Sequence, residues 1–226
     1  MIALIPTCSR PEMCLNVVNK IQGFDEIHLF VNNCDIEPYL KTFKNKTVTI
    51  HDYTHIKGEP KKCHNLTFQK MILAIPDNDI LIIEDDVNPC FNFVSRFMFK
   101  FVLIKSFSKK HFTLSPIFIP EKKCEYTKAE IKSFTVNNQL IQTQKYVDGN
   151  FAFPKELHKE LKKFIKKTNF PVQISNSGIS PILSKWMFKN DYPMYVTIPT
   201  MVEHGEHESL QFGEKRKSVP LIAKFD

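Results

Sequence analysis

The chain has 226 residues, of which 42% are hydrophobic and 24% are charged, a composition that excludes a disordered or fibrous protein. It contains no apolar run long enough to predict a membrane span, and its first residues lack the basic and apolar stretches of a secretion signal. Its 31 basic and 24 acidic residues give a formal net charge of +7, which suits a polyanionic partner but does not require one.

The first half alternates buried strands with helices. Apolar runs predict four strands, at Met1–Pro6, Ile27–Val31, Thr47–Ile50 and Ile80–Ile83. Apolar residues at helical spacing predict two helices, at Arg10–Gly23 and Leu66–Ile75. Strands rich in β-branched residues and separated by helices are typical of a mainly parallel sheet covered on both faces. In such a sheet we expect ligands at the carboxyl ends of the strands.

The second half predicts a similar but less regular alternation. Helices are expected at Phe91–Phe107, Pro154–Phe170 and Ile179–Lys189, and strands at Thr113–Ile119, Tyr146–Phe153 and Met194–Ile198. In the first of these helices, the aromatic residues from Phe97 to Phe101 are expected to pack inward. The sequence shows no internal repeat and no linker, so we expect residues 1–226 to form a single domain.

The cysteine spacing suggests a cellular compartment, and the amino-acid usage suggests a type of genome. The six cysteines have no CxxC spacing, which favours reduced thiols in a cytoplasmic protein. Lysine greatly outnumbers arginine, and isoleucine, asparagine and phenylalanine are abundant. This pattern is typical of an AT-rich genome, such as that of a bacteriophage or of a low-GC bacterium.

Three consecutive acids directly follow the most apolar predicted strand. Glu84, Asp85 and Asp86 come after Ile80–Ile83, so their carboxylates are expected at the carboxyl end of that strand. Acids packed this closely repel one another and raise one another's pKa unless a cation is present. Their hard oxygen ligands suit Mg²⁺ or Mn²⁺ beside substrate phosphates. A solvated acidic turn is the alternative interpretation.

Two histidines near the other end form a second candidate site. His204 and His207 are separated by Gly205 and Glu206, and a neutral imidazole is a good ligand for Mn²⁺ alongside carboxylates. The zinc-protease motif HExxH needs a helix, whereas the order here is HGEH in a stretch broken by glycine, so that interpretation is excluded. An exposed polar loop remains the alternative.

Together, three segments resemble the motifs of nucleotide-sugar glycosyltransferases of the GT-A type. The opening IPTCSRPE, residues 5–12, is similar to the P-T-x-x-R-P loop that cups the base and ribose of UDP. ILIIEDDV, residues 80–87, is similar to the strand that ends in the DxD-like motif, which holds Mn²⁺ against the diphosphate. PTMVEHGEHESL, residues 199–210, is similar to the P-S-L-V-x-H segment, whose histidine completes the metal shell.

The resemblance implies a Rossmann-like GT-A fold, with residues 1–100 as the nucleotide-binding half and residues 101–226 as the acceptor-side half. It also implies a set of donor contacts at the matching positions, namely Pro6, Thr7, Arg10, Asn32, Asn33, Gly58, Asn65, Glu84 and Asp85. Among the acids, Asp86 is the expected direct metal ligand, and Glu84 is expected to contact a ribose or sugar hydroxyl. His204 is the first choice for the late metal ligand, with His207 as the second.

The chain departs from the family pattern at the catalytic base. Inverting members carry an Asp or Glu at the start of a late helix to remove the acceptor's proton, but the matching residues 173–180 contain no acid. Asp148, in the sequence YVDGNF, is the nearest candidate, although an ordinary Asp-Gly turn is an alternative. Either Asp148 is the base of an inverting enzyme, or the enzyme retains configuration and needs no such base.

A lysine-rich helix bears on the acceptor. Six lysines are spread over it, at Lys155, Lys159, Lys162, Lys163, Lys166 and Lys167. They suit contact with the phosphates of a polyanion, although a merely solvated helix face is the alternative.

The sequence therefore predicts a metal-dependent glycosyltransferase that uses a UDP-sugar. Its first-choice acceptor is a hydroxymethylated base of double-stranded phage DNA, flipped out of the stack to reach the site. A cell-surface or wall polysaccharide is the second acceptor, and a non-catalytic nucleic-acid-binding module is the alternative from another class. The sequence leaves the sugar, the stereochemistry and the oligomeric state open.

Overall fold

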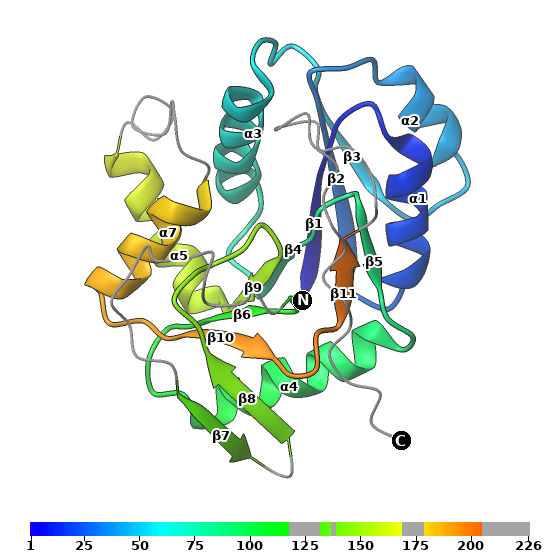
Figure 1. The fold of residues 1–226 in the computed structure, drawn as a ribbon. Coiled ribbons are helices and arrows are strands. Elements are labelled where there is room, and N and C mark those ends of the chain that lie inside the picture. Colours follow the sequence, from blue (N-terminus) through cyan, green and yellow to red (C-terminus); the bar gives the residue numbers. More distant parts are fainter. Residues whose placement is uncertain (118–131, 137–138, 169–178, 205–226) are drawn as a thin grey trace.

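The computed structural model describes residues 1–117, 132–136, 139–168 and 179–204 (Figure 1). Its strands are β1 (Ile2–Thr7), β2 (Glu26–Asn32), β3 (Thr49–Tyr53), β4 (Ile80–Ile82), β5 (Val87–Pro89), β6 (Thr113–Ser115), β7 (Ser133–Val136), β8 (Gln139–Thr143), β9 (Phe151–Phe153), β10 (Met194–Thr197) and β11 (Val202–His204). Its helices are α1 (Pro11–Lys20), α2 (Glu37–Thr42), α3 (Pro60–Ala74), α4 (Phe93–Phe107), α5 (Lys155–Lys167) and α7 (Ile179–Lys189).

The central sheet has nine strands in the order β3-β2-β1-β4-β9-β6-β10-β8-β7. The strands β3, β2, β1 and β4 are parallel, as the sequence of the first half predicts. The other half is mixed, because β9 runs antiparallel to both β4 and β6, and β8 runs antiparallel to β10. The predicted α/β fold is confirmed, while the mainly parallel arrangement is limited to the first half. An apolar run shows that a strand is buried but carries no information about its direction.

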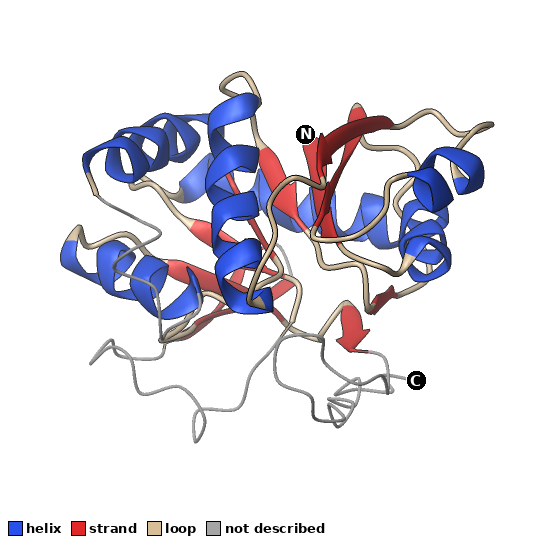
Figure 2. Cartoon of the chain, turned by 90° about the horizontal axis from the view of Figure 1, so that it is seen from above, coloured by secondary structure: helices blue, strands red, loops and turns tan. Residues whose placement is uncertain are grey.

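Alternation along the buried strands gives the sheet two apolar faces, each covered by helices (Figure 2). Ala3 and Ile5 of β1 face one core, which receives the apolar sides of α1, α2 and α4. Ile2 and Leu4 face the other core, together with α3, α5 and α7. This is the two-sided cover that parallel strands require.

Several elements were not predicted from the sequence. They are the short helix α2, the β7–β8 hairpin, and the strands β5 and β11, which pair with each other outside the central sheet. Each is too short to establish a periodicity of its own. The strand expected at Tyr146–Phe153 is reduced to β9, and the polar residues before it form a loop at the candidate site.

One packing expectation on α4 was wrong. Phe97 and Phe101 are buried, but the side chain of Phe99 between them is 54% exposed. The helical period of 3.6 residues places Phe99 on the opposite side of the helix from its two neighbours. The residues outside the core therefore include large aromatic side chains.

Two further predictions concern reduced cysteines and the absence of a membrane span. The five cysteines of the described residues are free thiols, and Cys124 lies outside them. No helix in the described ranges has the length and apolarity to cross a bilayer.

His158 of α5 links that helix to α3 and to the segment between α3 and β4. The side chain is fully buried, its Nε2 lies 3.0 Å from the carbonyl oxygen of Ile72, and its Nδ1 accepts from the backbone N–H of Asn78 at 3.3 Å. Both contacts use the neutral imidazole, with Nε2 as the donor. Burial lowers the pKa of His158 below its ordinary value of 6.5. We therefore expect His158 to stabilise the fold only while it is uncharged.

We predict that the free energy of unfolding contributed by His158 falls as the pH drops below about 6.5, because the unfolded chain then binds the proton first. Above that pH the contribution should be constant. The measurement is urea unfolding of the wild type and of His158→Gln between about pH 8 and about pH 5. The stability difference between the two should shrink toward the acid end. A difference that does not change with pH would contradict this role, and the exposed His55→Gln serves as the matched control.

Candidate active site

The carboxyl ends of β1, β2 and β4 bring the predicted donor residues to one edge of the sheet. Thr7 and Asn32 end two neighbouring strands, and the Asn32 side-chain amide donates to the Thr7 carbonyl oxygen at 3.3 Å. The chain then turns sharply after each strand, because Ser9 and Asn33 adopt left-handed backbone conformations with φ of 56° and 51°. Both loops therefore stay close to the strand ends, beside the acids that follow β4.

Asp85 is turned into the protein and anchors the first loop. Its carboxylate accepts a hydrogen bond from the Thr7 hydroxyl at 2.5 Å, and the Thr7 oxygen lies 2.7 Å from the Tyr39 hydroxyl. The backbone N–H of Arg10 donates to the Tyr39 oxygen at 2.9 Å. Burial raises the pKa of Asp85 to about 7, although the hydrogen bond from Thr7 opposes the shift. This network fixes the loop from Thr7 to Arg10 against β4.

Glu84 and Asp86 form a cluster with His204, separate from the Asp85 network. Ligand atoms of all three residues lie within 4.8 Å of one another. The His204 ring lies between the carboxylates, with Nε2 at 3.9 Å from Glu84 Oε2 and Nδ1 at 3.8 Å from Asp86 Oδ1. The pairing of β11 with β5 produces this arrangement, because His204 lies opposite Val87, the residue after Asp86.

Arg10 brings a positive charge to the acids. Its Nη1 lies 3.1 Å from Asp86 Oδ2 and 4.0 Å from Asp85 Oδ1, and the Arg10 and Asp86 side chains are both largely buried. A guanidinium so close to two carboxylates offsets part of their mutual repulsion. It also joins the loop after β1 to the acids after β4, two of the three segments that resemble GT-A motifs.

Asn150 positions Glu84 and was not assigned a role from the sequence. Its side chain is fully buried, its Oδ1 accepts from the Glu84 backbone N–H at 2.8 Å, and its Nδ2 donates to Glu84 Oε2 at 3.0 Å. The same Nδ2 lies 3.4 Å from Asp148 Oδ2. Asp148 is half-buried, and burial together with the charge of Glu84 raises its pKa. The loop before β9 therefore contributes directly to this edge of the sheet.

Two residues of the site could be found only through the fold. Tyr39 lies on α2, a helix that the sequence pattern did not predict, and no local motif links it to Thr7. Asn150 follows the sequence Asp-Gly, which is typical of a turn. A polar residue immediately before an apolar strand is a weak signal for a buried hydrogen-bonding group.

The remaining predicted donor residues lie in β1, in α3 and in the loops after β2 and β3. Pro6 is buried within β1, and Asn65 is buried on α3. The Asn33 amide donates to the Gly58 carbonyl oxygen at 3.4 Å, which joins the loops after β2 and β3. His207 lies outside the described residues, so only His204 can be placed.

Structural comparison relates the fold to known nucleotide-handling enzymes. A Bacillus anthracis protein assigned as a glucose-1-phosphate thymidylyltransferase, solved with sucrose, is 8% identical with a TM-score of 0.53, over 90% of this chain and 89% of that one. The 4-diphosphocytidyl-2C-methyl-D-erythritol synthase of Anaerococcus prevotii is 13% identical with a TM-score of 0.49, over 94% and 93%. At such low sequence identities, the comparison shows a similarity of fold alone. No protein-family model and no curated protein sequence matches the chain.

Gly149 provides a direct test of the position of Glu84. A β-carbon at residue 149 would lie 2.6 Å from Glu84 Oε1, closer than side chains approach one another. We predict that Gly149→Ala moves the Glu84 carboxylate out of the cluster, because the glutamate side chain yields more easily than the backbone.

The expected result for Gly149→Ala is at least about tenfold weaker Mn²⁺ binding, in line with the loss of a group that orients a metal ligand. The melting temperature should change little. Titration of Mn²⁺ followed by electron paramagnetic resonance gives the affinity, and a thermal melt gives the stability. Unchanged Mn²⁺ affinity would show that Glu84 is not a ligand.

Proposed function

We propose that the chain is a metal-dependent glycosyltransferase that transfers the sugar of a UDP-sugar to an acceptor hydroxyl and releases UDP. The single observation that carries this proposal is the convergence of Glu84, Asp86 and His204 at the carboxyl edge of the sheet, beside the loop that contains Thr7 and Arg10. Ligands of open α/β sheets bind at this edge. The order of the three segments along the chain also resembles the GT-A pattern.

The donor atoms of the cluster suit Mn²⁺ or Mg²⁺. Two carboxylates and one imidazole match the ligand preferences of Mn²⁺, and Mg²⁺ is bound through one or two carboxylates together with substrate phosphates. When bound, the ion supplies positive charge against the diphosphate leaving group. Glu84, Asp86 and His204 would hold it, which gives Glu84 a ligand role in place of the sugar contact expected from the sequence.

The protein's own residues would organise the donor and the proton transfer. Thr7 and Arg10, held by Asp85 and Tyr39, would form the wall against the nucleotide. Asp148 is the candidate base, because its raised pKa brings proton uptake closer to neutral pH and it lies beside Glu84. In a retaining enzyme, Asp148 would instead have an electrostatic role.

A nucleotidyltransferase is the second candidate, favoured by the fold shared with the Bacillus anthracis protein. The two reactions release different products. With Mn²⁺, a glycosyltransferase should release UDP from a UDP-sugar, slowly to water and faster with an acceptor. A nucleotidyltransferase should release pyrophosphate from a nucleoside triphosphate and a sugar 1-phosphate. Pyrophosphate release without UDP release would replace the first proposal with the second, and neither product would favour a non-catalytic module.

The acceptor we propose first is hydroxymethylated double-stranded DNA, with a surface or wall polysaccharide second. The supporting feature for DNA is the outer side of α5, where five of the six lysines are exposed: Lys155, Lys159, Lys163, Lys166 and Lys167. Lys162 is engaged within the protein, donating to Asp77 at 2.7 Å and to the Ile75 carbonyl oxygen at 2.6 Å. The lysine surface is therefore slightly smaller than the sequence suggested.

The DNA proposal has a specific binding test. Affinity for duplex DNA should fall roughly tenfold or more between low and physiological salt, if several phosphates are contacted. Replacing Lys159, Lys163 and Lys166 by glutamate should weaken DNA binding and leave UDP affinity unchanged. Hydroxymethylated DNA should accelerate UDP release, whereas unmodified DNA should not. No DNA binding at low salt, with turnover on a soluble glycan, would transfer the proposal to the polysaccharide.

A further inference from the structure

The outer side of α4 carries an exposed apolar surface that the proposed reaction does not use. Phe91, just before the helix, is 86% exposed, and Phe99 and Val102 are 54% and 56% exposed. Phe99 and Val102 share one side of the helix with the half-buried Met98, because residues three and four positions apart share a face. Phe91 lies before the helix and lines a depression together with Met98. We call these four residues, Phe91, Met98, Phe99 and Val102, the α4 surface.

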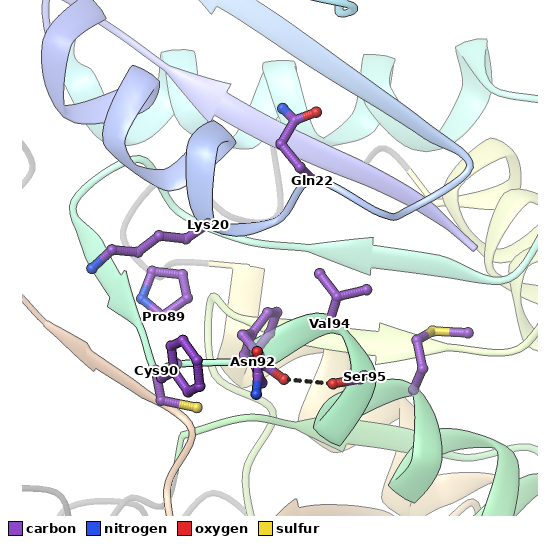
Figure 3. Close-up of a pocket in the computed structure, with 10 residues that line it drawn as sticks. Lys20, Gln22, Pro89, Cys90, Asn92, Val94 and Ser95 are labelled. Carbon is purple, nitrogen blue, oxygen red and sulfur yellow. Dashed lines mark hydrogen bonds between the residues drawn. The ribbon is translucent and has the colours of Figure 1, made fainter.

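Two open depressions adjoin the α4 surface. One depression, of about 760 Å³, lies where α4 begins, between the end of α1 and β5. Figure 3 shows Lys20 and Pro89 on one side of it and Asn92, Val94 and Ser95 of the α4 segment on the other. A second depression, of about 430 Å³, continues along the helix over Met98, Phe99 and Val102. The exposed side chains therefore stand beside space that another apolar group can enter.

The charged residues of α4 and of the segments that flank it in the sequence are all basic. No aspartate or glutamate occurs between Asp86 and Glu121 in the sequence. Lys105 and Lys110 are balanced by Asp79 and Asp191, to which they form ion pairs. The exposed Lys20, Arg96 and Lys109 have no ion-pair partner within the described part of the chain. Within the described residues, the unpaired charges beside the α4 surface are therefore those of Lys20, Arg96 and Lys109.

We propose that the α4 surface docks on an anionic lipid bilayer, with Phe91, Phe99 and Val102 entering the boundary between headgroups and acyl chains. Exposed aromatic and aliphatic side chains flanked by lysine and arginine are the features that hold proteins in the plane of such a membrane. A second copy of the chain fits less well, because a two-fold contact through this surface would bring the same positive charges together. The proposal is independent of the reaction assigned to the acidic cluster.

The test is co-sedimentation of the full chain with vesicles of phosphatidylcholine and phosphatidylglycerol at about 2:1, compared with phosphatidylcholine alone. Binding to the anionic vesicles should be at least about tenfold stronger and should weaken as salt is added. Phe99→Ser and Phe91→Ser should each lower it by about tenfold, which corresponds to the loss of one buried phenylalanine side chain. Arg96→Gln with Lys109→Gln should lower only the part that depends on phosphatidylglycerol.

Phe188→Ser is the matched control, because Phe188 is 49% exposed but lies on α7, on the other side of the sheet. It should leave vesicle binding unchanged. Absence of binding to anionic vesicles at low salt would overturn the proposal, and so would equal losses in Phe99→Ser and Phe188→Ser. A dimer in sedimentation equilibrium that Phe99→Ser dissociates, without vesicle binding, would assign the surface to a second copy instead.

Discussion

Asp86→Asn is expected to lower turnover by about a hundredfold or more, because it removes a charged oxygen ligand while keeping the side chain's size. Asp86 is the acid that links the cluster with His204 to the guanidinium of Arg10. The neutral amide would leave Arg10 without this ion pair and the metal without one carboxylate. The Mn²⁺ affinity, measured by electron paramagnetic resonance, should fall together with the rate of UDP release.

The control for Asp86→Asn is Glu203→Gln. Glu203 precedes His204 on β11, and successive residues of a strand point to opposite sides, so its carboxylate is directed away from the cluster. Glu203→Gln should retain the Mn²⁺ affinity and the turnover of the wild type. Equal losses in the two variants would indicate a general effect of negative charge rather than a metal ligand.

Phe97→Ala is expected to destabilise the fold by about 3–5 kcal/mol, the range for truncating a buried aromatic side chain. Phe97 is fully buried and stacks on Phe93 with ring centroids 5.3 Å apart, so its removal leaves a cavity between α4 and the sheet. Phe99→Ala, two residues away on the same helix, should change the stability by no more than about 0.5 kcal/mol because Phe99 faces outward.

Urea unfolding of the two alanine variants tests the orientation of α4. Similar losses in both would show that Phe99 is buried in solution, either by the fold or by an oligomer. That result would also remove the basis of the membrane proposal. The pair is informative because both changes have the same chemistry and the same helix propensity.

The sequence predicted the parts of the fold that depend on long periodic segments. The buried runs of β1, β2 and β4 are sufficient to place these strands, because burial on both faces leaves a near-continuous apolar pattern. The helical spacing of α1 places that helix in the same way. It could not orient β9, whose three residues are equally compatible with either direction. Aromatic character predicts an inward Phe99, but the helical period directs its side chain outward.

In the candidate site, too, the sequence predicts positions that local structure fixes but not contacts between residues distant in the sequence. The acids after β4 could be placed at the edge of the sheet, because a strand end fixes their position. Their separate orientations could not be predicted, since Asp85 turns inward only because Thr7 and Arg10 lie beside it. Tyr39 and Asn150 reach the site from segments far along the chain, and their contacts depend on the tertiary structure alone.

The two candidate surfaces on the molecule favour different acceptors for the proposed reaction. The α5 lysines and the α4 surface belong to helices that cover opposite faces of the sheet. Binding to anionic vesicles without binding to DNA would favour a polysaccharide assembled at a membrane. DNA binding without vesicle binding would favour the modified base.

Calorimetric titration of UDP into the wild-type protein, with Mn²⁺ and then with EDTA, tests most directly whether the cluster holds a metal that binds UDP. If Glu84, Asp86 and His204 hold the metal that binds the diphosphate, UDP should bind with Mn²⁺ and lose most of its affinity in EDTA. His204→Ala should reproduce much of that loss in the presence of Mn²⁺. Equal UDP affinity with Mn²⁺ and with EDTA would show that Glu84, Asp86 and His204 do not hold a metal that binds UDP.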